Sequence, residues 1–291
     1  MDDMHTTLID ARDLRALIDA GTPLKLYDCS VDLMDRARGR TLFEQGHIPG
    51  AFHADLETDL SDKSGTDAVC GGRHPMPSRE RFATWLGRTG LRTDMQVVVC
   101  EAEGSAFSVR LWWMLKWCGH EAVAVLDGGV AAWAAQGGKL ESGPGPEPDA
   151  QAAPYPLREP QVSMRSGDQI AGQLGSPGQT LIDARAAPRF RGEVEPLDPV
   201  AGHIPGALNR PFTENFGSDG RFKPAAQLRQ EFETLLAGRD PATVVHQCGS
   251  GVSALPNLLA MELAGLGRTA LYPGSWSEWC RTPGRVMARS S

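Results

Sequence analysis

The chain has 291 residues, of which 41% are hydrophobic and 22% charged, enough for two domains that each bury a core. The formal net charge of -7 argues against a nucleic-acid partner, because a phosphate backbone requires a basic face. The six cysteines show no CxxC pair and no zinc-ligand spacing, so we expect free thiols and no metal site.

We expect no targeting signal in the N-terminal residues. The stretch MDDMHTTLIDARDL is acidic and then amphipathic, without the basic and apolar regions of a signal peptide. No window approaches the roughly 18 uninterrupted apolar residues of a membrane span. We therefore expect a cytoplasmic protein that does not enter a membrane.

The predicted elements occur twice along the chain in the same order. Each copy has an apolar strand ending in Asp, a GHIPGA turn, a second apolar strand, a helix, and a closing strand with a turn. In the first copy these are residues 24–28, 46–51, 96–100, 108–119 and 122–133. In the second copy they are residues 180–183, 202–207, 243–247, 253–265 and 269–279. The identical order indicates a duplicated unit.

Strands that alternate with helices predict an α/β fold with a central parallel sheet flanked by helices in each copy. The run VVV at 97–99 has no polar alternation, which is typical of a strand buried on both faces. Residues 139–161 contain six prolines, so we expect an extended linker on the surface. The predicted domains are residues 1–138 and 162–291.

The two GHIPGA turns place His47 and His203 at equivalent positions. Proline and glycine together set a tight turn, in which a histidine can hydrogen-bond its own loop. We interpret both histidines as structural and not catalytic.

The segment after the second buried strand is the strongest candidate for chemistry. Cys248 follows the strand, and Gly249, Ser250, Gly251, Val252 and Ser253 lead into a helix with Pro256 in its first turn. Small residues allow successive backbone N–H groups to converge on one point, an anion-binding nest at a helix N-terminus. There they would lower the thiol pKa and favour the nucleophilic thiolate. The alternative is that Cys248 is a small buried residue, as cysteines often are.

The first copy differs at this point. Glu101 takes the place of Cys248, in a slightly longer loop, EAEGSAFS, that also carries Glu103. A carboxylate cannot act as a thiolate nucleophile and would repel an anionic substrate. We therefore expect residues 1–138 to be catalytically inactive.

The duplicated layout, the GHIPGA turns, the loop CGSGVSA and the closing GSWSEW resemble tandem-domain rhodanese-type sulfurtransferases. The resemblance covers nearly the whole chain. It implies two rhodanese-like domains with a catalytic cysteine only in the second. It also implies that Cys248 accepts sulfur from a small-molecule donor as a persulfide and passes it to a thiol or cyanide, with thioredoxin as a candidate acceptor. No cofactor is implied.

The neutral loop residues Gly249 and Ser250 are similar to those of 3-mercaptopyruvate sulfurtransferases, whereas members that prefer thiosulfate carry basic residues there. A monocarboxylate donor needs a cation at the pocket rim, for which arginine is suited by its bidentate geometry. The candidates are Arg185, Arg189 and Arg191; the resemblance favours Arg189 for the substrate, and Arg185 could instead brace the loop. The family's second arginine, before GHIPG, is missing from GEVEPLDPVA.

The same resemblance implies a proton relay of Asp55, His74 and Ser250. An oriented histidine and hydroxyl can manage the proton while sulfur leaves carbon. Asp55 and His74 come from the first half of the chain, so the alternative is that GRHPMP is only a structural turn.

Other functions fit less well. A cysteine phosphatase needs arginine six residues after the nucleophile, where this chain has Ala254. A thiosulfate:cyanide sulfurtransferase and a non-catalytic sulfur-binding module remain as alternatives on the same scaffold.

Overall fold

The computed structural model describes residues 4–289, which form two compact units that are not contiguous in sequence. The first unit comprises residues up to 61, 77–161 and 218–222. The second comprises 62–76, 162–217 and 223 onward. Each unit therefore contains a segment from the opposite half of the chain. The predicted domains, residues 1–138 and 162–291, are contiguous stretches of the chain, and their boundaries stay a prediction.

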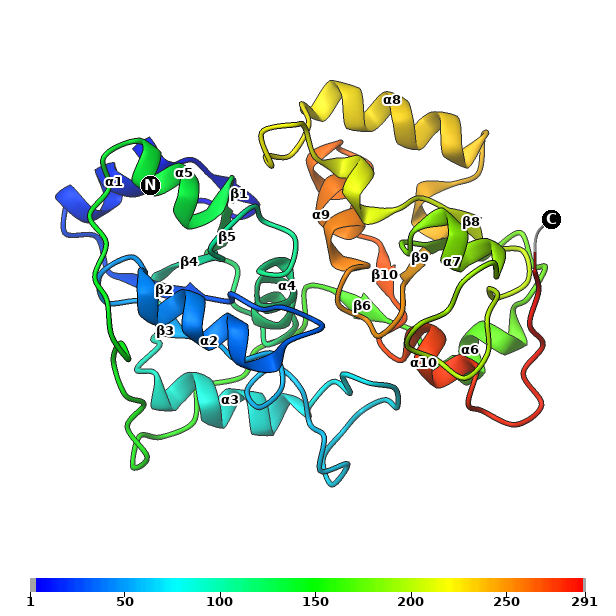
Figure 1. Ribbon diagram of the computed structural model, residues 1–291, viewed down its shortest axis with the longest axis horizontal. Helices are drawn as coiled ribbons and strands as arrows, with labels where there is room; N and C mark the ends of the chain where they lie inside the picture. The colour runs from blue at the N-terminus through cyan, green and yellow to red at the C-terminus, as the bar shows by residue number, and fades with distance from the viewer. Residues whose placement is uncertain (1–3, 290–291) are drawn as a thin grey trace. The chain divides into compact units, whose positions relative to one another are not determined.

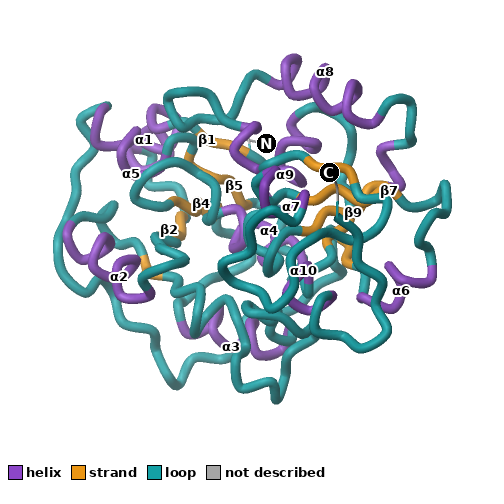
Figure 2. Tube along the Cα trace, turned by 45° about the vertical axis from the view of Figure 1, so that its right-hand side comes forward, coloured by secondary structure: helices purple, strands orange, loops and turns teal. Residues whose placement is uncertain are grey.

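The first unit is built on a five-stranded parallel sheet with the order β1-β5-β4-β2-β3 (Figure 1). Figure 2 shows β1, β5, β4 and β2 side by side, as this order requires. The elements are β1 (Leu8–Ile9), α1 (Ala11–Asp19), β2 (Leu24–Asp28), α2 (Arg36–Gln45), β3 (Phe52–His53), α3 (Arg79–Arg88), β4 (Gln96–Cys100), α4 (Val109–Trp117), β5 (Val123–Leu126) and α5 (Gly129–Ala135).

Helices cover both faces of this sheet. Successive side chains of a strand point to opposite faces, so each strand packs against helices on both sides. Leu26, Val98 and Leu126 pack into a core with α1, α2 and α5. The next residue of β2, Tyr27, faces α3, where its ring lies 5.4 Å from that of Trp85. The continuous apolar run at 97–99 is thus explained by burial on both faces, as the sequence predicts.

The second unit repeats the design, with the strand order β6-β10-β9-β7-β8. Its elements are β6 (Ser163–Met164), α6 (Gly167–Gly172), β7 (Thr180–Asp183), α7 (Ala187–Arg191), β8 (Leu208–Asn209), the 3-10 turn η1 (Phe212–Asn215), α8 (Ala225–Leu236), the 3-10 turn η2 (Pro241–Thr243), β9 (Val244–Gln247), α9 (Leu255–Leu263), β10 (Ala270–Leu271) and α10 (Ser275–Trp279). The α6 and α10 helices share a core with Leu181, Val245 and Ala270.

The two sheets have the same topology and register. Asp28 pairs with Cys100 across β2 and β4, and Asp183 pairs with Gln247 across β7 and β9. The predicted fold class, two tandem parallel sheets flanked by helices, is confirmed. The closing turns differ from the prediction, since each contains a short helix, α5 or α10. In α5, buried Val130 and Trp133 stand three residues apart, a helical spacing that the short segment obscures in the sequence.

The proline-rich segment 139–161 contains no helix or strand, as predicted, but it is tied to the first unit. Tyr155 is buried, and its N–H donates to the carbonyl of Ala83 at 2.8 Å. The N–H of Gln161 donates to the carbonyl of Lys116 at 3.1 Å. In Figure 1 this segment is the green trace that leaves α5. It is an extended strap on the first unit and not a freely moving linker.

No helix within residues 4–289 is long and apolar enough to cross a membrane. Over the same residues, no group of three or more His, Cys, Asp or Glu side chains is placed to hold a metal ion.

Candidate active site

Cys248 lies directly after β9, the central strand of the second sheet, at its carboxyl end. In parallel α/β sheets this edge carries the functional sites. The side chain is buried, with 1% of the residue exposed. Its N–H donates to Ser275 Oγ at 3.1 Å, and its carbonyl accepts from the N–H of Trp276 at 3.0 Å. The loop is thus fixed against α10 at the cysteine itself.

The next turn of the loop depends on Gly251. Its φ is +74°, and a Cβ there would lie 2.2 Å from the carbonyl oxygen of Pro273. Any side chain would therefore be both strained and in collision with backbone. Val252 is buried and Ser253 half-buried as the chain enters α9, with Pro256 in the first turn of the helix as the sequence predicts.

The equivalent loop of the first unit is already occupied by a carboxylate. The backbone contacts correspond, because Glu101 accepts through its carbonyl from the N–H of Val130 at 2.9 Å. The Glu101 carboxylate accepts from the N–H groups of Ala106, Phe107 and Ser108 at 2.6, 2.9 and 3.1 Å. Burial raises the pKa of Glu101 to about 8, while these three donors act in the opposite direction. This loop shape therefore gathers backbone N–H groups around an acidic group.

Residues 62–76 bring His74 and Arg73 close to the loop of the second unit. The segment is anchored to α10: the N–H of Gly71 donates to Glu278 Oε1 at 2.8 Å, and the N–H of Arg73 donates to Ser277 Oγ at 3.1 Å. His74 follows and is nearly buried; its Nδ1 lies 2.8 Å from Ser250 Oγ. The structure thus brings together two of the three residues of the expected relay.

Asp55, the third relay candidate, belongs to the first unit. Its carboxylate caps a local turn, where Oδ1 accepts from the N–H of Glu57 at 2.7 Å and of Thr58 at 3.1 Å. These bonds give Asp55 a role in its own turn, and its part in a relay remains a proposal.

The three arginines of the LIDARAAPRFRG segment have different surroundings. The Arg189 guanidinium pairs with Glu195 at 2.6 Å and lies near Gly249, where a Cβ would be 3.6 Å from Nη1. Arg191 pairs with Glu193 on the surface. Arg185 is 1% exposed, and its Nη2 donates both to Asp183 and to the carbonyl of Gly202 at 2.7 Å. Arg185 therefore fits the bracing alternative, and Arg189 stays the predicted substrate-binding arginine.

Arg73 is a neighbour of the loop that sequence reasoning missed. Its Nη2 lies 2.8 Å from the position of a Cβ on Gly249, closer than either Nη atom of Arg189. The guanidinium is paired with Asp198. The sequence feature that could have identified Arg73 is its position next to His74 in GRHPMP. Only the fold shows that this segment belongs to the second unit.

The histidines of the GHIPGA turns hold the backbone. His47 Nδ1 lies 2.8 Å from the carbonyl oxygen of Phe43, and His203 Nδ1 lies 2.8 Å from that of Phe190. Each histidine ring also stacks on the phenylalanine whose carbonyl it contacts. The ring centroids are 3.9 Å apart in the first unit and 4.0 Å apart in the second. These contacts support the structural interpretation, although the partners lie in the preceding helices and not in the turns.

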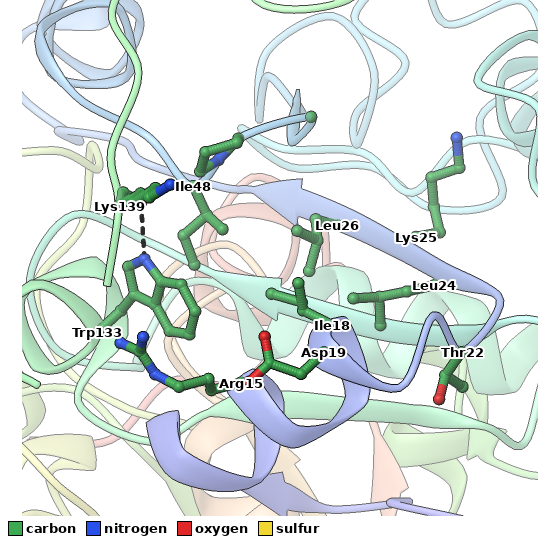
Figure 3. Close-up of a pocket in the computed structure, with 12 residues that line it drawn as sticks. Arg15, Ile18, Asp19, Thr22, Leu24, Lys25, Leu26, Ile48, Trp133 and Lys139 are labelled. Carbon is green, nitrogen blue, oxygen red and sulfur yellow. Dashed lines mark hydrogen bonds between the residues drawn. The ribbon is translucent and has the colours of Figure 1, made fainter. Parts of the chain in front are cut away.

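Each unit has its own hollow, at the edge of its sheet opposite to the loops described above. In the first unit it has a volume of about 530 Å³ and lies beside Leu24, the first residue of β2, and Ile48 of the GHIPGA turn. Figure 3 shows Arg15 and Lys139 on either side of Trp133 at its rim. The second unit has a hollow of about 520 Å³ beside Thr180 and Pro205. Both are a feature of the repeat and lie at the amino ends of the strands, away from Cys248.

Known proteins share this architecture. The profile of the rhodanese-like domain matches residues 7–136 and 166–282. A Pseudomonas aeruginosa protein named "Probable 3-mercaptopyruvate sulfurtransferase" is 46% identical over 97% of each chain. SseB of Mycobacterium tuberculosis, named provisionally as a thiosulfate sulfurtransferase, is 39% identical over 98% of this chain and 97% of its own.

A crystal structure agrees with these relatives. SseA from Escherichia coli, described as a 3-mercaptopyruvate sulfotransferase with the rhodanese fold, superposes with a TM-score of 0.75 at 31% identity, over 93% of this chain and 99% of its own. The chain therefore belongs to the rhodanese family, with two tandem rhodanese-like domains. Its class within the family is that of the sulfurtransferases, as the names of these full-length relatives support.

Proposed function

We propose that the protein transfers sulfur from 3-mercaptopyruvate to a thiol or cyanide through a persulfide on Cys248. The observation that carries the proposal is the position of this thiol. Cys248 follows the central strand β9, in a loop whose counterpart in the first unit gathers three backbone N–H groups around a carboxylate. We infer that the corresponding N–H groups of the second loop surround the sulfur of Cys248, as a site for a nucleophilic cysteine requires.

The reaction has two steps. The Cys248 thiolate attacks the sulfur of mercaptopyruvate, the carbon–sulfur bond breaks, and its electron pair remains on carbon as the enolate of pyruvate. That carbon takes up a proton to give pyruvate, and the enzyme holds Cys–S–SH. A thiolate or cyanide then attacks the outer sulfur and leaves as persulfide or thiocyanate, which regenerates Cys248.

The proton for the enolate is the task that we assign to Ser250 and His74. Their hydrogen bond of 2.8 Å allows the hydroxyl to donate while the imidazole supplies the next proton. Asp55 stays the third residue of the relay as a proposal from the family resemblance alone. The nearly buried position of His74 keeps bulk water from competing for the proton.

The donor is assigned from the uncharged Gly249 and Ser250 and from the cation beside them. Arg189 presents a guanidinium at Gly249 and is 19% exposed, so a small carboxylate can reach it. Thiosulfate is the second candidate donor, because two guanidinium groups near Gly249 would also attract a compact dianion. SseB of Mycobacterium tuberculosis, with its thiosulfate name, supports keeping this candidate.

The acceptor is proposed to be a small thiol, cyanide or the dithiol of thioredoxin. All six cysteines are free thiols in the structure, which fits a reducing compartment such as the cytoplasm.

Mass spectrometry tests the persulfide. After incubation with mercaptopyruvate and removal of the donor, we expect a gain of about 32 Da on the peptide that contains Cys248. The Cys248→Ser variant should show neither this gain nor turnover, because an alcohol cannot form a persulfide. Cys280→Ser serves as the control and should keep both. Pyruvate formation at the wild-type rate by Cys248→Ser would refute the proposal.

A further inference from the structure

We propose that Arg73 is the second carboxylate-binding residue of the donor pocket, delivered by the 62–76 segment. The inference rests on the proposed mercaptopyruvate chemistry and adds a residue that determines donor specificity. No arginine stands in the GEVEPLDPVA segment, where the resemblance places one. Arg73 supplies a guanidinium to the same loop from elsewhere in the chain.

The position of Arg73 fits this role. Its Nη2 lies 2.8 Å from a Cβ position on Gly249, and the Arg189 Nη atoms lie 3.6 and 3.7 Å from the same point. Two guanidinium groups therefore converge on the residue next to the nucleophile. In mercaptopyruvate three bonds separate the sulfur from the carboxylate carbon, and neighbouring Cα atoms are about 3.8 Å apart. A donor with its sulfur at Cys248 thus has its carboxylate within range of residue 249.

Both the backbone and the side chain of Arg73 are held in place by contacts. Its N–H is bonded to Ser277 Oγ, and its guanidinium is paired with Asp198, whose side chain is fully buried. Gly72 permits this close approach to α10, with a φ of +95° and a Cβ position 2.6 Å from Ser277 Oγ. The side chain of Arg73 is still 24% exposed, so a solute can reach it.

The surrounding charges leave this site attractive to an anion. Arg73, Arg189 and Arg281 all lie within 4 Å of Asp198, and Arg185 and Arg189 share Glu195. With Asp183, which pairs with Arg185, four guanidinium groups share three carboxylates. Of these four groups, Arg73 and Arg189 contribute the three atoms nearest to a Cβ position on Gly249, so their positive charge is presented at the residue next to the nucleophile.

The test compares two donors that differ only in the carboxylate: mercaptopyruvate and mercaptoacetone, which has a methyl group in its place. For Arg73→Gln we expect kcat/KM to fall about tenfold to hundredfold with mercaptopyruvate and less than about twofold with mercaptoacetone. Arg73→Lys should give a smaller loss, again only with mercaptopyruvate, since lysine keeps the charge but not the bidentate fork.

Arg281→Gln is the matched control. Arg281 also pairs with Asp198, at 2.7 Å, but contributes none of the three atoms nearest to a Cβ position on Gly249, so its loss should change kcat/KM less than about threefold for either donor. An equal loss with both donors in Arg73→Gln, or no loss with mercaptopyruvate, would overturn the inference.

Binding of pyruvate separates this inference from the proposed function. Calorimetric titration of the Cys248→Ser protein with pyruvate needs no turnover, and adding Arg73→Gln should weaken binding about tenfold or more. Unchanged pyruvate affinity would overturn the role of Arg73 whatever the donor. A wild type that makes no pyruvate from mercaptopyruvate would instead refute the proposed function.

Discussion

The paired geometry of Arg189 and Glu195 determines what a substitution at Arg189 should do. The guanidinium donates to both carboxylate oxygens, at 2.6 and 3.3 Å, which aims its remaining N–H groups at Gly249. Arg189→Lys keeps the charge but loses the planar fork. We expect KM for mercaptopyruvate to rise about tenfold, which corresponds to about 1.4 kcal/mol, with little change in melting temperature.

Arg191→Lys is the control for this prediction, because Arg191 pairs with Glu193 at the surface. Steady-state kinetics and thermal unfolding of both variants provide the measurement. Equal KM values for the wild type and Arg189→Lys would remove Arg189 from the pocket.

At the scale of the element, the Glu101 loop of the first unit predicts a pH-dependent stability. Burial raises the pKa of Glu101 to about 8, so the folded state holds the proton that the unfolded chain loses near pH 4.5. The protonated Glu101 therefore leaves the folded state fully stable below about pH 4.5. As the pH rises from there to about 8, the free energy of unfolding falls by on the order of 5 kcal/mol.

Glu101→Gln should remove this cost. The melting temperature of the variant, relative to the wild type, should increase between pH 5 and pH 9. Glu103→Gln, which changes an exposed carboxylate in the same loop, should show no such trend. If the difference between Glu101→Gln and wild type stayed constant with pH, the buried carboxyl would not be the group that titrates.

The elements of the sheets could be predicted from the sequence because they depend on local patterns. Residues 24–28, 96–100 and 180–183 form the strands expected from their apolar runs. The loop after Gln247 could be predicted for the same reason, because a run of small residues between a strand and a helix is a local sequence pattern. The short helices α5 and α10 could not, because five to seven residues give too little periodicity.

At the scale of the whole molecule, the two halves of the chain are interleaved. Residues 62–76 pack with the second unit, and residues 218–222 pack with the first, where the N–H of Phe222 donates to Asp127 at 3.0 Å. This exchange places His74 and Arg73 at a loop some 175 residues further along the chain. No local pattern encodes such a placement, which explains why Arg73 escaped the sequence analysis.

The central claim, that Cys248 takes its sulfur from a carbon-bound monocarboxylate donor, is tested most directly by comparing kcat/KM for mercaptopyruvate and thiosulfate. Both donors are assayed with the same acceptor at matched pH and ionic strength, since screening alters the attraction of a dianion more than that of a monoanion. We predict that kcat/KM is higher for mercaptopyruvate by at least about tenfold. A wild-type enzyme that favours thiosulfate would contradict the account.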